Sequence, residues 1–211
     1  MSMTVKPITP SEAGPEVKPI YDRVKAKYMI VPIFFQAIAQ VPHLLASYVR
    51  QIGLEEKGVS LPASLIDLIH YATAQEFSCS YCTGSAMMTL RINGYSERAI
   101  SALKGRSEAM EFDAKTRRLL SFARLLARNP ERVTASEIGE LRAAGFSDEA
   151  IISAAALVAA SGFTTRITGV LRIEPDGIVS AANSPLGRRL LIPFMRLMMR
   201  RGQPPAEAVP A

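Results

Sequence analysis

Two cysteines, Cys79 and Cys82, stand three positions apart in the run Cys-Ser-Tyr-Cys and are the only cysteines in the chain. Ser78 precedes them as a predicted helix cap, so both thiols are expected at a helix N-terminus. Amide dipoles there stabilise a thiolate, which is the attacking form of cysteine. Because the spacing lets one sulfur resolve the other, the pair predicts redox chemistry.

Two other interpretations of the pair are open. The cysteines could be small buried apolar side chains without a chemical role. They could also bind zinc together with His70 and Asp67, but structural zinc prefers more thiolate or imidazole ligands. The chain has only two histidines, His43 and His70, and no second Cys-x-x-Cys. We therefore predict neither a metal nor a cofactor.

Asp67 and His70 are the acid and base candidates. They are three residues apart, so one helix face can carry both, and the imidazole could activate a thiol. The alternative is a core or interface histidine bonded to Asp67 or to backbone. Glu76, three residues before Cys79, is a second candidate acid, although a surface carboxylate is the favoured interpretation.

Two further side chains are candidates with weaker signals. Tyr81 could donate a hydrogen bond to a reacting oxygen or serve in aromatic packing. Arg166 could bind a carboxylate substrate or form a structural ion pair.

The elements that must position these residues are helices. Apolar residues recur at spacings of three and four, and proline, capping and glycine signals mark the boundaries. The predicted N-caps are Ser60, Asp113, Thr134 in a capping box with Glu137, and Ser147. No segment alternates as a strand does. We predict an all-α fold of about seven to nine helices without a sheet, with helices over 16–28, 32–40, 42–52, 60–77, 78–92, 113–128, 134–145, 147–168 and 190–201.

The 211 residues fit one helical domain over 1–185, with an N-terminal arm at 11–30 and a core carrying the cysteines at 31–177. Residues 186–211 form a basic extension, in which five arginines stand against Glu207, a net charge of +4. We expect an amphipathic helix and a disordered tail there, covering a neighbouring subunit in preference to an anionic membrane.

The remaining net charge, +2 of +6, is too small for the basic face of a nucleic-acid-binding protein. The first residues, Met1 to Pro7, lack the apolar stretch of a secretory signal, and the apolar run at 151–160 is short for a bilayer span. A cytoplasmic location is therefore expected.

The stretch from Leu61 through Asp67 to Cys82 resembles the motif of the carboxymuconolactone decarboxylase and alkylhydroperoxidase D superfamily. That motif is an acid, eleven residues, Cys-x-x-Cys, three residues and a histidine. The likeness extends to 31–35, 162–167 and 174–176. It implies an alkylhydroperoxidase D-like helical fold and a homo-oligomer.

Carried over to this chain, the resemblance implies that Cys82 attacks, that Cys79 resolves and that Asp67 helps as acid or base. Two positions depart from the motif. Asp67 replaces a glutamate and shortens its reach by one methylene, and Ala86 stands where the relay histidine would be. His70 as a substitute base is our own hypothesis.

The predicted function is a thiol-dependent peroxidase or disulfide reductase that draws electrons from an external dithiol. One alternative is a decarboxylase-like enzyme that acts on a small carboxylated lactone, which would not need paired cysteines. Another is a weakened, oligomeric member of the family that lost its relay histidine.

Overall fold

The structure is a computed structural model that describes residues 3–105 and 111–200. The described residues form eleven α-helices and one 3-10 turn, with no strand, which confirms the all-α prediction. Two short helices, Glu97–Gly105 and Gly177–Asn183, lie outside the nine predicted ranges. The elements are α1 (Lys18–Tyr28), α2 (Ile33–Ile38), α3 (Pro42–Lys57), α4 (Ala63–Glu76), α5 (Ser80–Ile92), α6 (Glu97–Gly105), α7 (Ala114–Arg128), η2 (Pro130–Arg132), α8 (Ala135–Ala143), α9 (Asp148–Leu171), α10 (Gly177–Asn183) and α11 (Pro185–Arg200).

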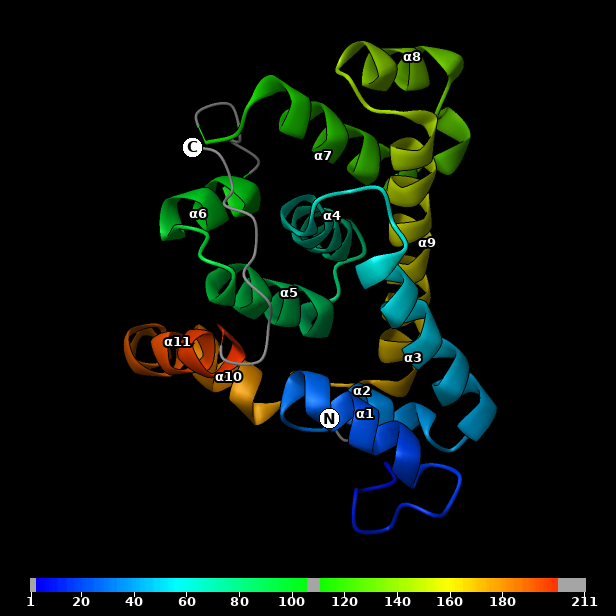
Figure 1. Cartoon of the computed structure of the whole chain (residues 1–211), viewed down its shortest axis with the longest axis vertical. Helices are drawn as coiled ribbons and strands as arrows, with labels where there is room; N and C mark the ends of the chain where they lie inside the picture. Colours follow the sequence, from blue (N-terminus) through cyan, green and yellow to red (C-terminus); the bar gives the residue numbers. More distant parts are fainter. Residues whose placement is uncertain (1–2, 106–110, 201–211) are drawn as a thin grey trace.

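Helix α4 lies at the centre, and α5, α7 and α9 pack around it (Figure 1). Its side chains Leu68, Ile69, Tyr71 and Ala72 are all buried, on more than one side of the helix. A helix that is apolar almost all round is stable only when neighbours cover it. The segment that carries the candidate acid and base is therefore also the core of the fold.

Helix α9 is the long element on the right of Figure 1. Ser147 caps it, with its Oγ accepting from the Ala150 N–H at 3.2 Å, as the sequence predicts. Among the described helices it alone is long and apolar enough to cross a membrane by length and composition. Half of its most apolar window is buried, and it packs against α4, α5, α7 and α8. Packing inside this fold accounts for its apolar composition.

Other predicted helix starts are confirmed in detail. Asp113 caps α7 through the Thr116 N–H at 2.6 Å, and Thr134 with Glu137 forms a capping box on α8. Ser60 does not cap α4, because that helix begins at Ala63 after Pro62. The Ser60 N–H instead donates to the Ser153 hydroxyl on α9 at 3.2 Å.

The N-terminal helices α1, α2 and α3 form an aromatic cluster below α9. Phe34 and Tyr48 meet edge-on with ring centroids 5.0 Å apart, and Tyr81 of α5 lies beside Phe34. The Tyr48 hydroxyl is 2.8 Å from the Thr164 hydroxyl of α9. This contact joins α3 to α9.

Helices α10 and α11 pack against α5. A Cβ at Gly187 would lie 1.8 Å from the Ala181 carbonyl oxygen, so only glycine permits this approach. Buried Arg91 donates to Glu97 Oε1 at 2.6 Å, and its carbonyl accepts from Arg196 at 2.8 Å. These bonds join α5, α6 and α11. The amphipathic helix predicted in the basic C-terminal extension is thus present as α11. The tail predicted after it, at 201–211, lies outside the described residues.

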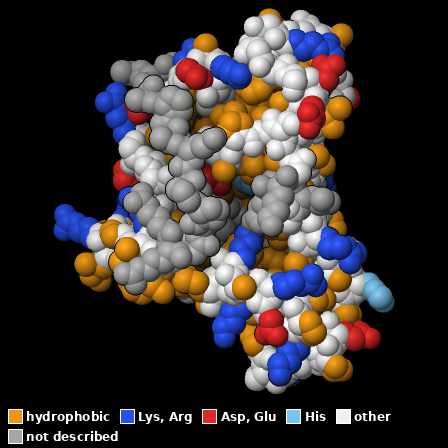
Figure 2. Space-filling model, in the orientation of Figure 1, with side chains coloured by type: hydrophobic (Ala, Val, Ile, Leu, Met, Phe, Trp, Pro, Cys, Tyr) orange, Lys and Arg blue, Asp and Glu red, His pale blue; other side chains and the backbone are white. Residues whose placement is uncertain are grey.

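The outward side of α11 carries a row of exposed apolar side chains. These are 43% to 67% exposed, and they gather at the lower left of Figure 2: Leu186, Leu190, Phe194, Leu197 and Met198. Spacings of four, four and three place them on one helix face.

Asp67 joins α4 to the C-terminal end of α5. Its Oδ2 accepts from Asn93 Nδ2 at 2.5 Å, and Asn93 is the C-cap of α5. Burial raises the pKa of Asp67 to about 6, and the Asn93 bond opposes only part of this rise. The native protein therefore holds this proton more tightly than the unfolded chain does.

We expect the free energy of unfolding to fall as the pH rises from about 4 to about 6, because the unfolded chain ionises Asp67 first. Asp67→Asn removes this fall and makes the protein about 2 kcal/mol more stable at pH 8. Urea unfolding between pH 3.5 and 8 measures the effect, with exposed Asp22→Asn on α1 as the control. If the free energy of unfolding of Asp67→Asn falls with pH as much as that of the wild type, Asp67 is not the group whose raised pKa causes the fall.

Candidate active site

The turn between α4 and α5 places the two cysteines. Only Phe77, Ser78 and Cys79 separate the helices, and the Cys79 N–H returns to the Ala74 carbonyl at 3.2 Å. Ser78 adopts a left-handed backbone with φ of 53°. A helix N-cap has an extended backbone, so Ser78 cannot occupy that position. The prediction of Ser78 as the cap is wrong.

Cys79 is the N-cap of α5 instead. Its Sγ accepts from the Cys82 N–H at 3.1 Å, and its backbone is extended. The prediction that the pair lies at a helix N-terminus is thus confirmed. The helix end directs its amides at the Cys79 sulfur, an arrangement that favours negative charge on it.

Cys79 and Cys82 are joined by a disulfide, with their Cα atoms 5.3 Å apart. Cys79 is 9% exposed, and Cys82 is partly buried against the aromatic cluster of the N-terminal helices. The fold therefore allows the two sulfurs to form a bond.

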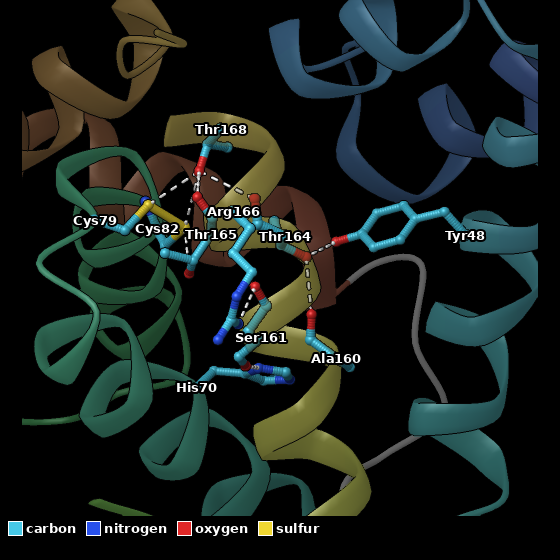
Figure 3. The surroundings of a disulfide bond; sticks show 11 residues. Tyr48, His70, Cys79, Cys82, Ala160, Ser161, Thr164, Thr165, Arg166 and Thr168 are labelled. Atoms are coloured by element: carbon cyan, nitrogen blue, oxygen red, sulfur yellow. Dashed lines mark hydrogen bonds between the residues drawn. A yellow bond between two sulfur atoms is a disulfide. The ribbon is translucent and has the colours of Figure 1, made fainter. Parts of the chain in front are cut away.

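Two threonine hydroxyls of α9 face the sulfurs, as Figure 3 shows. Thr165 Oγ1 is 3.5 Å from Cys82 Sγ, and Thr168 Oγ1 is 3.4 Å from Cys79 Sγ and 3.8 Å from Cys82 Sγ. The Thr168 hydroxyl already donates to the carbonyls of Thr164 and Thr165 at 3.0 and 2.9 Å. Thr168 can therefore only accept from a thiol, whereas Thr165 can donate to a thiolate.

Neither threonine was among the predicted site residues. Thr165 falls within the stretch 162–167 that carries the family resemblance, and Thr168 lies about one helical turn after Thr165. Spacing on α9 places both on one face, but nothing in the sequence shows that this face meets the cysteines.

His70 points at α9, one turn before Thr165. Its Nδ1 lies 2.9 Å from the Ser161 hydroxyl (Figure 3). Burial lowers the pKa of the imidazole to about 4, and the charge of Lys27 acts in the same direction. The ring is therefore neutral at pH 7. Its predicted role as a base requires a route through Ser161 and Thr165 to Cys82.

Asp67 and the cysteines lie at opposite ends of α5. Asp67 is bonded to Asn93 at the C-cap, and Cys79 occupies the N-cap. Fourteen helical steps separate these caps, roughly 20 Å at 1.5 Å per residue. The structure therefore does not bring Asp67 beside the sulfurs. Ala86, at the place of the motif histidine, packs with an apolar cluster that includes Leu68 and Leu90.

Glu76 is an internal carboxylate, and the interpretation as a surface residue is wrong. Its side chain is 1% exposed and pairs with Arg124 and Arg128 of α7. Arg128 Nε donates to Glu76 Oε2 at 2.9 Å. The charge is directed at α7 and ties the end of α4 to that helix.

Of the two roles considered for Tyr81, the contacts favour the structural one, because its ring packs beside Phe34. Its hydroxyl donates to Asp176 Oδ2 at 3.4 Å, and Asp176 Oδ1 accepts from the Ile33 N–H at 2.9 Å. Burial raises the pKa of Tyr81 well above its usual value and also raises that of Asp176. Asp176 thus ties the first turn of α2 to α5, next to Cys82.

Arg166 has no carboxylate partner among the described residues. Its guanidinium lies over the Phe77 ring at 5.3 Å and donates to the Gly162 carbonyl at 3.0 Å. A Cβ at Gly162 would lie 2.8 Å from this guanidinium, so glycine makes room for the stack. Arg166 supports the ring that follows α4.

A cleft of about 460 Å³ opens beside Cys79. Cys79 lines it, whereas Cys82 is not among its described lining residues. The floor and walls come from the α4–α5 turn and the end of α9: Phe77, Ser78, Cys79, Ser80, Tyr81, Thr165, Thr168, Gly169, Arg172, Ile173 and Glu174. An external thiol entering this cleft would meet the Cys79 sulfur first.

Across residues 3–105 and 111–200, no three side chains of His, Cys, Asp or Glu converge as they would around a metal ion. The four residues considered for zinc are dispersed, because Asp67 is directed at Asn93 and His70 at Ser161.

No protein-family model and no curated protein matches the chain. Solved structures do match. An alkylhydroperoxidase D core from Ralstonia eutropha JMP134, described as an uncharacterized peroxidase-related protein, has a TM-score of 0.73 at 21% identity. The match covers 83% of this chain and 96% of that one.

The debrominase Bmp8, solved as a cysteine-to-alanine variant with 2,3,4-tribromopyrrole, has a TM-score of 0.74 at 17% identity, over 92% of this chain and 98% of that one. A peroxidase-related protein from Silicibacter sp. TM1040 has a TM-score of 0.71 at 20% identity, over 78% and 88%. These likenesses establish the architecture. The chain has the alkylhydroperoxidase D-like helical fold.

Proposed function

We propose that the chain is a thiol-dependent peroxidase that cycles Cys79 and Cys82 between dithiol and disulfide. The observation that carries this proposal is the disulfide at the start of α5, with one sulfur in a cleft and the Thr165 hydroxyl against the other. The fold shared with peroxidase-related proteins supports it.

In the proposed cycle the Cys82 thiolate attacks a peroxide oxygen and the O–O bond breaks. The leaving oxygen takes a proton, and Cys82 becomes a sulfenic acid. Cys79 then attacks the Cys82 sulfur, releases water and closes the disulfide. An external dithiol, of the kind found in a reducing cytoplasm, then supplies two electrons to the Cys79–Cys82 disulfide and is itself oxidised to a disulfide.

The position of Cys79 in the lining of the cleft supports a return step at this residue. A reductant thiolate that attacks Cys79 Sγ expels Cys82 as a thiolate, which Thr165 is placed to stabilise. The same steps in reverse reduce a carrier disulfide, so a disulfide reductase needs no other site.

Reductive dehalogenation is a second candidate, because the matched debrominase shares the fold. Replacement of a C–Br bond by C–H consumes two electrons, which a closing thiol pair supplies. Release of bromide from a bromopyrrole by the reduced protein, without peroxide consumption, would select this function.

We expect Cys82→Ser to lower peroxide consumption with dithiothreitol by at least about 100-fold, because the attacking thiol is lost. Without dithiothreitol, pre-reduced Cys79→Ser should consume one equivalent of peroxide and stop at the Cys82 sulfenic acid. Serine is a good N-cap, so this variant keeps α5. Full peroxide consumption by Cys82→Ser contradicts the proposal. Wild-type protein whose thiols stay reduced under peroxide favours the alternative of a catalytically weakened, oligomeric member of the family.

Thr165→Val should raise the pKa of the Cys82 thiol by about one unit, because the thiolate loses its hydroxyl donor. Thr165→Ser keeps the donor, and Thr168→Val removes only an acceptor. The pH dependence of iodoacetamide alkylation, measured in a Cys79→Ser background, gives this pKa. Equal values in all four proteins would show that Thr165 does not stabilise the thiolate.

We also propose that a second copy of the chain covers the apolar row on α11, as the predicted homo-oligomer requires. The row exposes roughly 500 Å² of apolar surface, at the upper end for monomers. Leu190→Glu should weaken self-association at least about tenfold in sedimentation velocity. Exposed Ser180→Glu on α10 is the control. The interface is contradicted if Leu190→Glu self-associates as strongly as the wild type. It is also contradicted if the wild type does not self-associate and instead binds anionic vesicles.

A further inference from the structure

The wall of the cleft after α9 carries two opposite charges. Arg172 and Glu174 are both exposed and line the cleft, and Ile173 between them is 5% exposed and faces the core. Within the described part of the chain, neither charge has an ion-pair partner inside 4 Å, and they do not pair with each other. Both charges are therefore available to a molecule in the cleft.

The backbone at this cleft is held in an unfavourable conformation. Three described residues other than glycine have positive φ, and two of them, Ser78 and Arg172, line the cleft at φ of 53°. Arg172 is the C-cap of α9, a position where glycine is the relaxed choice. Strained residues of this kind concentrate at ligand sites. Arg172 thus places a cationic side chain at the wall of the cleft, in a backbone conformation that glycine would adopt more easily.

We propose that this cleft binds a zwitterionic thiol or its disulfide, that is, an amino-acid-type ligand with a carboxylate, an ammonium group and a sulfur. Arg172 takes the carboxylate, because a guanidinium matches its two oxygens. Glu174 takes the ammonium group, and the ligand sulfur reaches Cys79. The cleft volume of about 460 Å³ suits a small ligand of this class.

This inference rests on the proposed redox cycle of the cysteine pair, and it names as the reductant two molecules of a zwitterionic monothiol in place of one dithiol. The ligand thiol loses its proton to solvent, and its thiolate attacks Cys79 Sγ. The Cys79–Cys82 bond breaks, Cys82 leaves as a thiolate, and a mixed disulfide forms at Cys79. A second ligand thiolate attacks the ligand sulfur, so the ligand leaves as its own disulfide and Cys79 is reduced.

Four small thiols of different charge test the ligand class: cysteine, 3-mercaptopropionate, cysteamine and 2-mercaptoethanol. Reduction of the oxidised protein is followed by alkylation and mass spectrometry, with rates divided by the thiolate concentration of each reagent. We expect the corrected rate of reduction by cysteine to exceed that by 2-mercaptoethanol at least about tenfold, because cysteine forms at least one charge-assisted contact. The other two thiols should lie between them.

Variants separate the two charges. Arg172→Gln should slow reduction by cysteine and 3-mercaptopropionate, and Glu174→Gln should slow reduction by cysteine and cysteamine. Arg172→Gly, which relaxes the left-handed backbone, serves as a second variant that should fold at least as well. Arg189→Gln, exposed on α11 outside the cleft, should change none of the rates.

Equal corrected rates for all four thiols, or a preference for cysteine that persists in both Arg172 variants, would overturn the inference. Peroxide turnover with neutral dithiothreitol is measured on the same preparations. If dithiothreitol sustains turnover while the four thiols react equally, the ligand class is wrong and the peroxidase stands. The expected thiol pattern without peroxide turnover supports the ligand site and rejects the peroxidase.

Discussion

The Cys79 sulfur caps α5, and the candidate site is arranged around that hydrogen bond. Sulfur is a weak acceptor, and serine, threonine, aspartate or asparagine at this position would bind the Cys82 N–H more strongly. The neighbouring Ser78 is held in a left-handed conformation that keeps its hydroxyl out of the cap. The turn therefore directs the helix end at a thiol and gives up some stability to do so.

Two carboxylates near the turn, Glu76 and Asp176, are bonded to groups other than the thiols. Glu76 is the carboxylate closest in sequence, and two arginines of α7 hold it away from the sulfurs. Asp176 is bonded to the Ile33 amide and the Tyr81 hydroxyl. What remains against the cysteines is a pair of neutral hydroxyls on α9. A thiolate formed here would depend on the helix N-terminus and on Thr165, because no carboxylate of the described residues forms a hydrogen bond with either sulfur.

The sequence predicted those features that depend on local chemistry. The caps at Asp113, Thr134 and Ser147 are each set by residues within one turn, and all three are confirmed. The Glu76 ion pairs and the Thr165 contact join residues far apart in the chain. Their formation depends on how α4, α7 and α9 pack, which periodicity does not encode. Arg172 gave no signal, because an arginine after an apolar helix is common.

The absence of the motif histidine has a structural consequence at Ala86. This methyl group packs in the cluster that contains Leu68, Leu90 and Leu103, so the position belongs to the apolar contact between α4 and α5. An imidazole there would have to displace that packing to approach the thiols. The polar groups that do run towards Cys82 begin with His70 on α4 and continue on α9 with Ser161 and, one helical turn later, Thr165. Their hydroxyls can relay a proton only if solvent or a ligand bridges that turn. On this route, proton transfer at Cys82 would depend on what occupies the space between α4 and α9, a dependence that a histidine attached to α5 itself would not impose.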